Sequence, residues 1–217
     1  MKDTIQIDSV FLEYGELKVL RGASLTIACN QVIGILGRNG CGKSCLLKII
    51  TGQIQPQFKY INYKGQQLLN LYKEQGLINY LPQHEFHPKS IRVERLLYYY
   101  GIDADQFVGR YSFFKDYLSL KFSKLSGGER RLVEVLIVLE AASKFTILDE
   151  PFSHIMPNHI AIVKERITEL RQHKGIIVTD HQYENVMDVS DNLYLLKDGV
   201  IGEVKDKEDL KWKGYIL

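Results

Sequence analysis

The sequence predicts an α/β fold with a mainly parallel sheet, and three features of the chain support this prediction. Short apolar runs, typical of strands buried on both faces, recur as "VIGILG", "FTILD", "GIIVTD" and "LYLL". Stretches with helical periodicity lie between several of these runs. A glycine-rich loop joins the first of the runs to a helical stretch. Strands that alternate with helices form parallel sheets, which bind ligands at the carboxyl ends of their strands.

Further local signals define the remaining elements. The first thirty residues are rich in β-branched and aromatic residues and turn at Gly15, which predicts an antiparallel hairpin. The stretch "KSCLLKIITG" predicts a helix followed by Gly52, and "NHIAIVKERITELRQHK" predicts a helix whose end is marked by Gly175. Residues from about 57 to 83 are strand-like, and the tail predicts a hairpin that turns at Asp198 and Gly199.

An aromatic-rich segment with "LLYYYG" and "YSFFKDYLSL", which we expect to be helical, interrupts the alternation after residue 84. The sequence contains no internal repeat, low-complexity tract or Pro/Ser-rich linker that would separate this segment from the rest. We therefore expect a single domain over residues 1–217. It would contain an N-terminal antiparallel β sub-domain and a helical sub-domain inserted at about residues 84–142.

Composition places the chain among ordinary globular proteins. Of its 217 residues, 25% are charged and 45% are apolar, and the formal net charge of +2 gives no reason to expect nucleic acid as a partner. The apolar runs are too short to cross a bilayer, and the N-terminus "MKDTIQID" does not look like a signal peptide. The odd number of cysteines, without metal-site spacing, favours a reducing compartment. We expect a cytoplasmic location.

The glycine-rich loop "GRNGCGKS" fits the Walker A pattern GxxxxGK[ST] and has the required place between a strand and a helix. Glycines let successive backbone amides point at phosphate oxygens, and the start of the helix adds a favourable field. Lys43 would reach the β- and γ-phosphates, and the Ser44 hydroxyl would bind Mg²⁺. The sequence thus predicts a P-loop NTPase core. The residues expected to hold the nucleotide are Gly37, Arg38, Asn39, Gly40, Cys41, Gly42, Lys43 and Ser44.

Asp149 and Glu150 are adjacent carboxylates at the end of an apolar run. Adjacent carboxylates repel each other and need a cation, a proton or a partner, although a strand that ends at the surface would also account for them. Given the phosphate loop, we expect Asp149 to hold Mg²⁺ as the strand-end acid of a P-loop site. Glu150 would then orient or deprotonate the water that attacks the γ-phosphate.

The order of five motifs resembles that of the ATP-binding cassette (ABC) ATPases over almost the whole chain. These motifs are "GRNGCGKS", "LPQ" ending at Gln83, "LSGGE", "ILDEP" and "TDH" ending at His181. Among them "LSGGE" discriminates best, because very few other P-loop proteins have it. The resemblance implies hydrolysis of ATP with Mg²⁺ in a homodimer, or in a heterodimer with another cassette. The two cassettes would lie head to tail with two nucleotides between them, each held by one subunit's P-loop and by the other's Ser126, Gly127 and Gly128.

The resemblance also implies roles for single residues. Gln83 would contact Mg²⁺ or the attacking water, His181 would hydrogen-bond the γ-phosphate, and Tyr14 would stack on adenine. Taken alone, a glutamine after a strand is usually solvated and a lone histidine is more often structural. Aromatic residues near a hairpin turn often only pack against their neighbours.

Two positions leave alternatives open. The family usually has an aspartate where this chain has Met156, which is either a harmless local variant or a change in the coupling between the two sites. Cys41 lies in the phosphate loop beside a helix N-terminus, where a thiol gains thiolate character, yet it also suits the place as a small filling side chain.

The resemblance implies a peripheral subunit on the cytoplasmic face of the membrane, whose integral membrane permease is a separate chain. The stretches "DEPFSHIMP" and "VTDHQYENVMDVSDNLYLLKDGVI" are similar to cassettes of lipopolysaccharide export and of branched-chain amino-acid uptake. A short helix of the permease would dock in a groove beside the helical sub-domain. The aromatic residues that either line this groove or form the core of the sub-domain are Tyr98, Tyr99, Tyr100, Phe113 and Phe114.

A different class of function is a soluble ABC ATPase that acts on the ribosome or on DNA. Chromosome-maintenance relatives carry a long coiled coil between the phosphate loop and the signature, but only 83 positions separate Lys43 from Ser126. Translation-factor relatives carry two cassettes in one chain, and both classes favour a more basic surface than +2 indicates. A nucleotide switch without hydrolysis is disfavoured, because Glu150 and His181 are both present.

Overall fold

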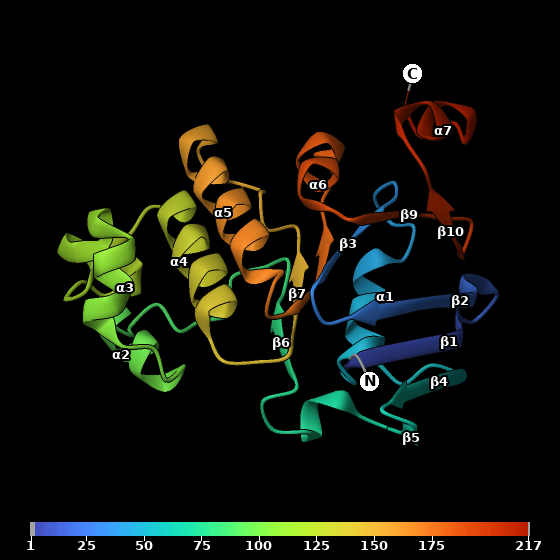
Figure 1. Ribbon diagram of the computed structural model, residues 1–217, viewed down its shortest axis with the longest axis horizontal. Helices are drawn as coiled ribbons and strands as arrows, with labels where there is room; N and C mark the ends of the chain where they lie inside the picture. The colour runs from blue at the N-terminus through green and yellow to red at the C-terminus, as the bar shows by residue number, and fades with distance from the viewer. Residues whose placement is uncertain (1–2, 217) are drawn as a thin grey trace.

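Two sheets and the helices packed on them make up the computed structural model, which describes residues 3–216 (Figure 1). The larger sheet has the strand order β10-β9-β3-β8-β7-β6. Strands β9, β3, β8, β7 and β6 run parallel, and β10 pairs antiparallel with β9 at one edge. The predicted mainly parallel sheet is confirmed. Its strands are β3 (Gln31–Leu36), β6 (Ile78–Leu81), β7 (Phe145–Asp149), β8 (Gly175–Thr179), β9 (Asn192–Lys197) and β10 (Val200–Val204).

The smaller sheet is antiparallel and has the order β2-β1-β4-β5. Its first two strands form the predicted N-terminal hairpin, in which Tyr14 pairs with Leu17 and Gly15 turns at a φ of +59°. Its strands are β1 (Thr4–Tyr14), β2 (Leu17–Ala28), β4 (Phe58–Tyr63) and β5 (Gln66–Gln67).

The parallel sheet is buried on both faces, because alternate residues of its strands enter two different apolar cores. Val32 and Val178 belong to the core that the sheet shares with helices α4, α5 and α6. Their chain neighbours Ile33 and Ile177 belong to the core that contains α1 and the antiparallel sheet. Strands with two buried faces read as continuous apolar runs, which is why "VIGILG" and "GIIVT" stood out in the sequence.

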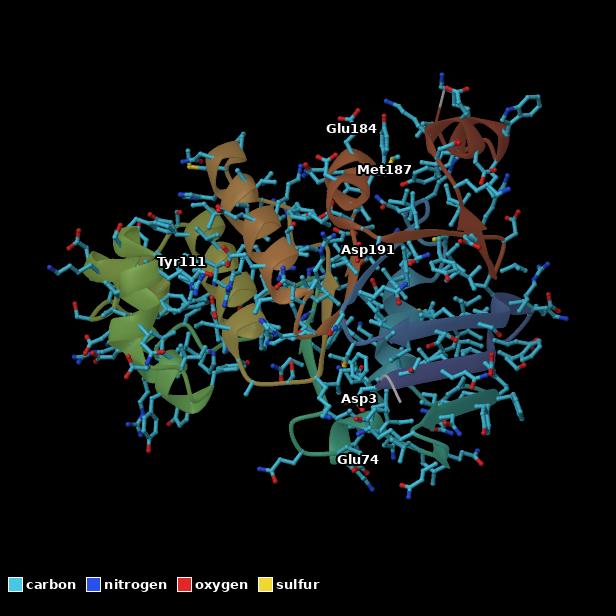
Figure 2. All side chains as sticks on the ribbon, in the orientation of Figure 1. Asp3, Glu74, Tyr111, Glu184, Met187 and Asp191 are labelled. Carbon is cyan, nitrogen blue, oxygen red and sulfur yellow. The ribbon has the colours of Figure 1, made fainter. Side chains whose placement is uncertain are left out.

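The helices lie mainly on the two faces of the sheet and in one segment between β6 and β7 (Figure 1). That segment contains α2, α3, α4 and two short 3₁₀ turns. Within this segment Tyr111, labelled in Figure 2, follows α3. Its hydroxyl donates to Oε1 of Glu140, the last residue of α4, at 2.6 Å. No helix within residues 3–216 has the length and apolar character that crossing a membrane requires. The helices are α1 (Lys43–Ile50), α2 (Val93–Tyr99), α3 (Ala104–Arg110), α4 (Gly127–Glu140), α5 (Pro157–Leu170), α6 (Tyr183–Val189) and α7 (Lys207–Trp212).

Besides the turn at Gly15, two of the element ends predicted from glycines are correct and one is wrong. Gly52 follows α1 with a φ of +83°, and Asp198 and Gly199 form the turn between β9 and β10 with positive φ angles, as predicted. Gly175 does not end a helix, because α5 stops at Leu170 and Gly175 is the first residue of β8. The glycine has a packing reason instead: a Cβ there would lie 2.5 Å from a ring carbon of Phe145.

Candidate nucleotide-binding and hydrolysis site

The phosphate loop leaves the end of β3 and enters α1 through two tightly packed glycines. A Cβ on Gly37 would lie 2.5 Å from Sγ of Cys41 and 2.7 Å from the carbonyl oxygen of Leu196. Gly42 is the N-cap of α1 and has a φ of +106°, a conformation that strains any other residue. Only glycine fits both positions, so the sequence forces the backbone to curl closely around the start of the helix.

Lys43 points back into this loop. Its side chain is buried, and its Nζ donates to the carbonyl oxygens of Gly37 at 2.6 Å and Arg38 at 3.3 Å. A buried ammonium group needs acceptors, and phosphate oxygens of a nucleotide could take the place of these carbonyls. Ser44 follows in the first turn of α1 and is half-buried. The loop and these two side chains therefore fit the phosphates of a nucleotide.

Asp149 is the last residue of β7 and is almost fully buried. Its Oδ1 accepts a hydrogen bond from Oγ1 of Thr179 at 2.8 Å, and its Oδ2 accepts one from the Tyr80 hydroxyl at 3.4 Å. Burial raises the pKa of Tyr80, so the phenol remains a donor. Residues 3–216 contain no cluster of three or more His, Cys, Asp and Glu side chains suited to a metal. Mg²⁺ at Asp149 would take several of its ligands from phosphate and water, as is usual for this ion.

Glu150 and His181 come together beside this carboxylate. Strands β7 and β8 pair in parallel with Asp149 opposite Thr179, so the residues that follow each strand leave the same edge of the sheet. Oε2 of Glu150 lies 3.8 Å from Nδ1 of His181, and Oγ of Ser153 lies 3.4 Å from both atoms. Glu150 has a φ of +54°, a strained conformation of the kind found at functional sites.

The predicted signature forms the start of α4. Oγ of Ser126 accepts a hydrogen bond from the Glu129 amide at 3.3 Å, and Oε2 of Glu129 accepts one from the Ser126 amide at 2.7 Å. This reciprocal capping box fixes the end of the helix. Ser126 and Gly127 are exposed, whereas Gly128 lies against the carbonyl oxygen of His154, which would be 2.8 Å from an added Cβ. The turn is rigid and open to the outside.

Two further predicted residues follow β6 and end β1. Gln83 follows β6, is exposed, and lines a cavity of about 450 Å³ together with Gly128 and His154. It therefore faces the signature side. Tyr14 ends β1 at the hairpin turn, where 54% of its surface is exposed and its ring is available for stacking.

Comparison with known proteins decides the family. The family model described as "ABC transporter" matches residues 20–153. The chain is also 32% identical, over 87% of its own length and 84% of the relative's, to the lipopolysaccharide export system ATP-binding protein LptB of Haemophilus influenzae. This chain belongs to the ABC transporter family. It is thus an ATP-binding and ATP-hydrolysing transporter subunit, as the resemblance of its motifs predicted.

Other similarities agree with the cassette assignment. The probable branched-chain amino acid transport ATP-binding protein LivG of Methanocaldococcus jannaschii is 27% identical over 97% of this chain and 94% of its own. Among solved structures, an ATP-binding subunit of an ABC transporter gives a TM-score of 0.82 at 19% identity, covering 97% of this chain and 93% of its own. A nucleotide-free ATP-binding cassette gives a TM-score of 0.77 at 23% identity, covering 96% and 94%. At these identities the structures support the fold.

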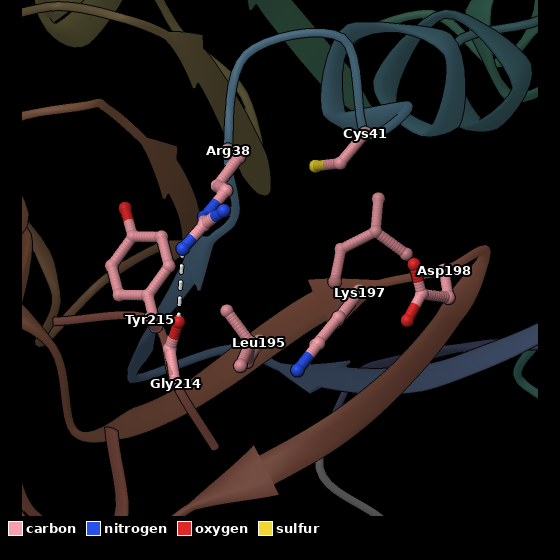
Figure 3. A pocket seen from close by; sticks show the side chains of 8 residues that line it. Arg38, Cys41, Leu195, Lys197, Asp198, Gly214 and Tyr215 are labelled. Atoms are coloured by element: carbon pink, nitrogen blue, oxygen red, sulfur yellow. Dashed lines mark hydrogen bonds between the residues drawn. The ribbon is translucent and has the colours of Figure 1, made fainter. Parts of the chain in front are cut away.

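Behind the phosphate loop, the cassette contacts its own C-terminal segment (Figure 3). Nη2 of Arg38 donates to the carbonyl oxygen of Gly214 at 3.1 Å, beside a cavity of about 190 Å³ that Cys41 and Tyr215 also line. Cys41 is half-buried, and its Sγ packs against Gly37. This packing supports the interpretation of Cys41 as a filling side chain.

Sequence reasoning missed the buried charges that hold the site together. Both carboxylate oxygens of Asp180 accept backbone hydrogen bonds at 3.0 Å, one from Phe152 and one from Gln182, and burial raises the pKa of this acid. Arg131 and Glu134 are buried within α4. The sequence could have indicated this pair, because two opposite charges three positions apart lie on one face of a helix and interrupt the apolar run "RRLVEVLIVLEAA".

Proposed function

We propose that the protein drives transport as a dimer in which each ATP is held by the P-loop of one cassette and by the turn Ser126–Gly128 of the other. The dimer is formed by two copies of this chain or by this chain and a second cassette. ATP enters with Mg²⁺, whose protein ligands would be Ser44, Asp149 and Gln83. Hydrolysis separates the cassettes, and this movement is passed to a separate integral membrane permease.

The exposed signature turn is the observation that carries this proposal. A capping box already satisfies the Ser126 amide, while the turn faces outward at the N-terminus of a fourteen-residue helix. Helix N-termini attract anions, because their free amides and the helix dipole point at the same place. The γ-phosphate of a partner's nucleotide is the anion that suits this turn.

Within each site we assign the roles from the geometry described above. Lys43 and the loop amides bind the phosphates, and Tyr14 stacks on adenine. Glu150 orients or deprotonates the attacking water, and His181 donates a hydrogen bond to the γ-phosphate. The short distance between Glu150 and His181 supports a joint action on one reacting group.

We place the permease contact on an inserted helical sub-domain at about residues 84–142. Tyr98 and Tyr99 are 70% and 63% exposed and are free to meet a partner, whereas Phe114 is fully buried. The protein would lie on the cytoplasmic face of the membrane. One relative is named for lipopolysaccharide export and another for branched-chain amino acid transport, so we assign the choice of cargo to the permease.

An aspartate at position 126 tests the sandwich. Aspartate caps a helix as well as serine does, so Ser126→Asp should keep the fold, but its charge would repel the γ-phosphate. In sedimentation with ATP, Glu150→Gln protein should form a dimer and Glu150→Gln with Ser126→Asp should stay monomeric. Ser123→Asp, at an exposed serine three residues earlier, is the control for added charge and should still dimerise. Dimerisation of the Ser126→Asp protein would contradict the proposal.

The membrane partner is tested by affinity capture. Tagged Glu150→Gln protein, incubated with ATP and solubilised membranes, should retain an integral membrane protein. Lys43→Ala protein, which lacks the phosphate-binding ammonium group, should retain much less and is the control for nucleotide dependence. Capture of ribosomal or DNA-associated proteins instead would support a soluble ABC ATPase with a non-membrane partner.

A further inference from the structure

A single buried guanidinium holds the backbone next to the catalytic side chains. Arg131 of α4 is only 4% exposed. Its Nη2 donates to the carbonyl oxygens of Asp149 at 2.8 Å and Glu150 at 3.1 Å, and its Nη1 donates to that of Pro82 at 2.8 Å. The guanidinium therefore joins the loop after β6 to the loop after β7.

These carbonyls belong to the peptides that orient the proposed catalytic groups. Pro82 immediately precedes Gln83, and the other two carbonyls belong to Asp149 and Glu150 themselves. The guanidinium is planar and its donors have fixed directions, so it sets the relative position of the peptides it binds. Lysine cannot replace it, because an ammonium group is a compact charge on a flexible stem.

Glu134 lies next to Arg131 on the same face of α4 and is fully buried. Its Oε2 is 3.6 Å from Nη1 of Arg131, which is an ion pair but too long for a hydrogen bond. Within residues 3–216, neither this Oε2 nor Nε of Arg131 has a hydrogen-bond partner. The ion pair between Arg131 and Glu134 thus leaves one donor and one acceptor without a hydrogen bond, although both side chains are buried.

The other carboxylate oxygen of Glu134 is linked to the loop after β6 and, through it, to the end of α2. Oε1 accepts from the Phe86 amide at 3.2 Å and lies 3.1 Å from Nδ1 of His87. Nε2 of His87 is 3.1 Å from the hydroxyl of Tyr100, the residue that caps the end of α2. A neutral His87 satisfies both contacts, since its Nδ1–H donates to Glu134 and its Nε2 accepts from Tyr100. Buried side chains thus run from α2 to the ends of β6 and β7.

We propose that Arg131 is a positioning residue for ATP hydrolysis, which aligns Gln83 with Glu150 and is itself held by Glu134 and His87. Neither the family match nor the motifs assign this role, and the inference rests on the catalytic roles proposed above for Gln83 and Glu150. Arg131 would affect the rate of the chemical step and leave the binding of ATP to the P-loop unchanged. Through His87, Glu134 and Arg131, the end of α2 would be linked to the reacting groups.

The test separates kcat from nucleotide affinity. Arg131→Lys keeps the charge and loses the planar fork, so kcat should fall about 10- to 100-fold, since small misplacements of reacting groups have effects of this size. The dissociation constant for ATP without Mg²⁺ should change less than about threefold. The number of ATP molecules bound per protein molecule in the same titration gives the fraction of the variant that is folded. His87→Phe keeps a ring in the packing and removes both hydrogen bonds, and should lower kcat by about 3- to 10-fold.

Arg166 provides a matched control. It is another largely buried arginine, on α5, with an ion pair to Glu140 at 2.7 Å. Its Nε has no hydrogen-bond partner within residues 3–216, and its ion-pair partners Glu140 and Glu169 are not residues of the site. Arg166→Lys should keep kcat within about twofold of the parent. Equal losses of kcat in Arg131→Lys and Arg166→Lys, or an unchanged kcat in Arg131→Lys, would overturn the inference.

A double variant tests whether the chain acts as one unit. If His87 acts through Arg131, then His87→Phe should lower kcat little further in protein that already carries Arg131→Lys. Independent, multiplying losses would remove His87 from the proposal. Glu134→Gln keeps the size of the side chain and serves if Arg131→Lys does not fold, and it should also lower kcat with unchanged ATP affinity. A parent protein without any ATPase activity would contradict the proposed function itself.

Discussion

Nδ1 of His181 lies 3.8 Å from Oε2 of Glu150, and these two side chains follow the ends of neighbouring parallel strands. Their proximity results from the register of β7 and β8, which places Asp149 opposite Thr179. Ser153 bridges the pair at 3.4 Å from each. The proposed base and the proposed hydrogen-bond donor thus lie close together beside the buried Asp149, where P-loop enzymes bind their metal.

Replacing Glu150 by glutamine should stop hydrolysis while ATP still binds. Glutamine has the size of glutamate but cannot take a proton, and a general base contributes about 10²- to 10⁴-fold to a rate. We expect phosphate release to fall at least about 100-fold, with the dissociation constant for ATP unchanged. Glu165→Gln, at an exposed glutamate of α5, is the control and should keep the parent rate. If Glu150→Gln remains active, Glu150 is not the base.

The two signature glycines should respond differently to alanine. A Cβ on Gly128 would lie 2.8 Å from the carbonyl oxygen of His154, whereas the nearest atom to a Cβ on Gly127 is 3.9 Å away. Gly128→Ala should therefore lower the free energy of unfolding by about 1–3 kcal/mol, since overpacking against the backbone forces it to shift. Gly127→Ala should stay within about 0.5 kcal/mol of the parent. Urea titration of both variants decides, and equal changes would contradict the packing.

Tyr111 should make the protein less stable in alkali. Its buried hydroxyl donates to Glu140 at 2.6 Å, and burial together with this hydrogen bond raises the pKa of Tyr111 above the ordinary value. The unfolded chain loses the phenol proton near pH 10 while the folded chain keeps it, so the folded state binds more protons there. The stability that Tyr111 contributes is complete below about pH 10 and is lost as pH rises further.

The measurement is the slope of the unfolding free energy between about pH 9 and pH 11. Tyr111→Phe should flatten this slope, because it removes the proton that only the folded state retains. Tyr98→Phe, at a tyrosine that is 70% exposed, is the control for the loss of a phenol. Burial also raises the pKa of Tyr80, which adds to the slope in both variants. Identical slopes for Tyr111→Phe and the parent would contradict this assignment.

Met156→Asp should stabilise α5. Met156 is the N-cap of this helix and is 61% exposed, and Pro157 occupies the first turn. Among residues 3–216, the Met156 side chain caps no helix amide. An aspartate there would accept a hydrogen bond from a free amide and should add about 0.5–2 kcal/mol to the free energy of unfolding in urea. Met156→Ala is the control and should add nothing. If Met156→Asp gains no stability, the capping geometry is wrong.

The same variant decides between the two interpretations of Met156. The Hill coefficient of the ATPase reports coupling between the two sites of a dimer. A changed coefficient in Met156→Asp protein would assign altered coupling to the methionine. An unchanged coefficient and rate would make Met156 a local substitution without functional effect.

The nucleotide loop could be predicted from the sequence because its physics is local. Gly37 to Ser44 are contiguous, and the glycines at positions 37 and 42 themselves allow the tight curl of the backbone there. The position of Asp149 at the end of a strand could also be predicted, since "FTILD" is an apolar run that stops at the acid. Gly175 shows where local reasoning fails. Its glycine is required by Phe145, a residue thirty positions away, and not by the helix before it.

By itself, the sequence determined the order of elements, the phosphate loop and the identity of the acids that follow the strands. These features depend on residues that are neighbours in the chain or repeat with the period of a strand or helix. Only the tertiary structure decided that Arg131 would bind the carbonyls of Pro82 and Asp149, and that His181 would meet Glu150. The reason is that a buried polar group must find its partner wherever the packed chain supplies one, and no spacing in the sequence encodes that place.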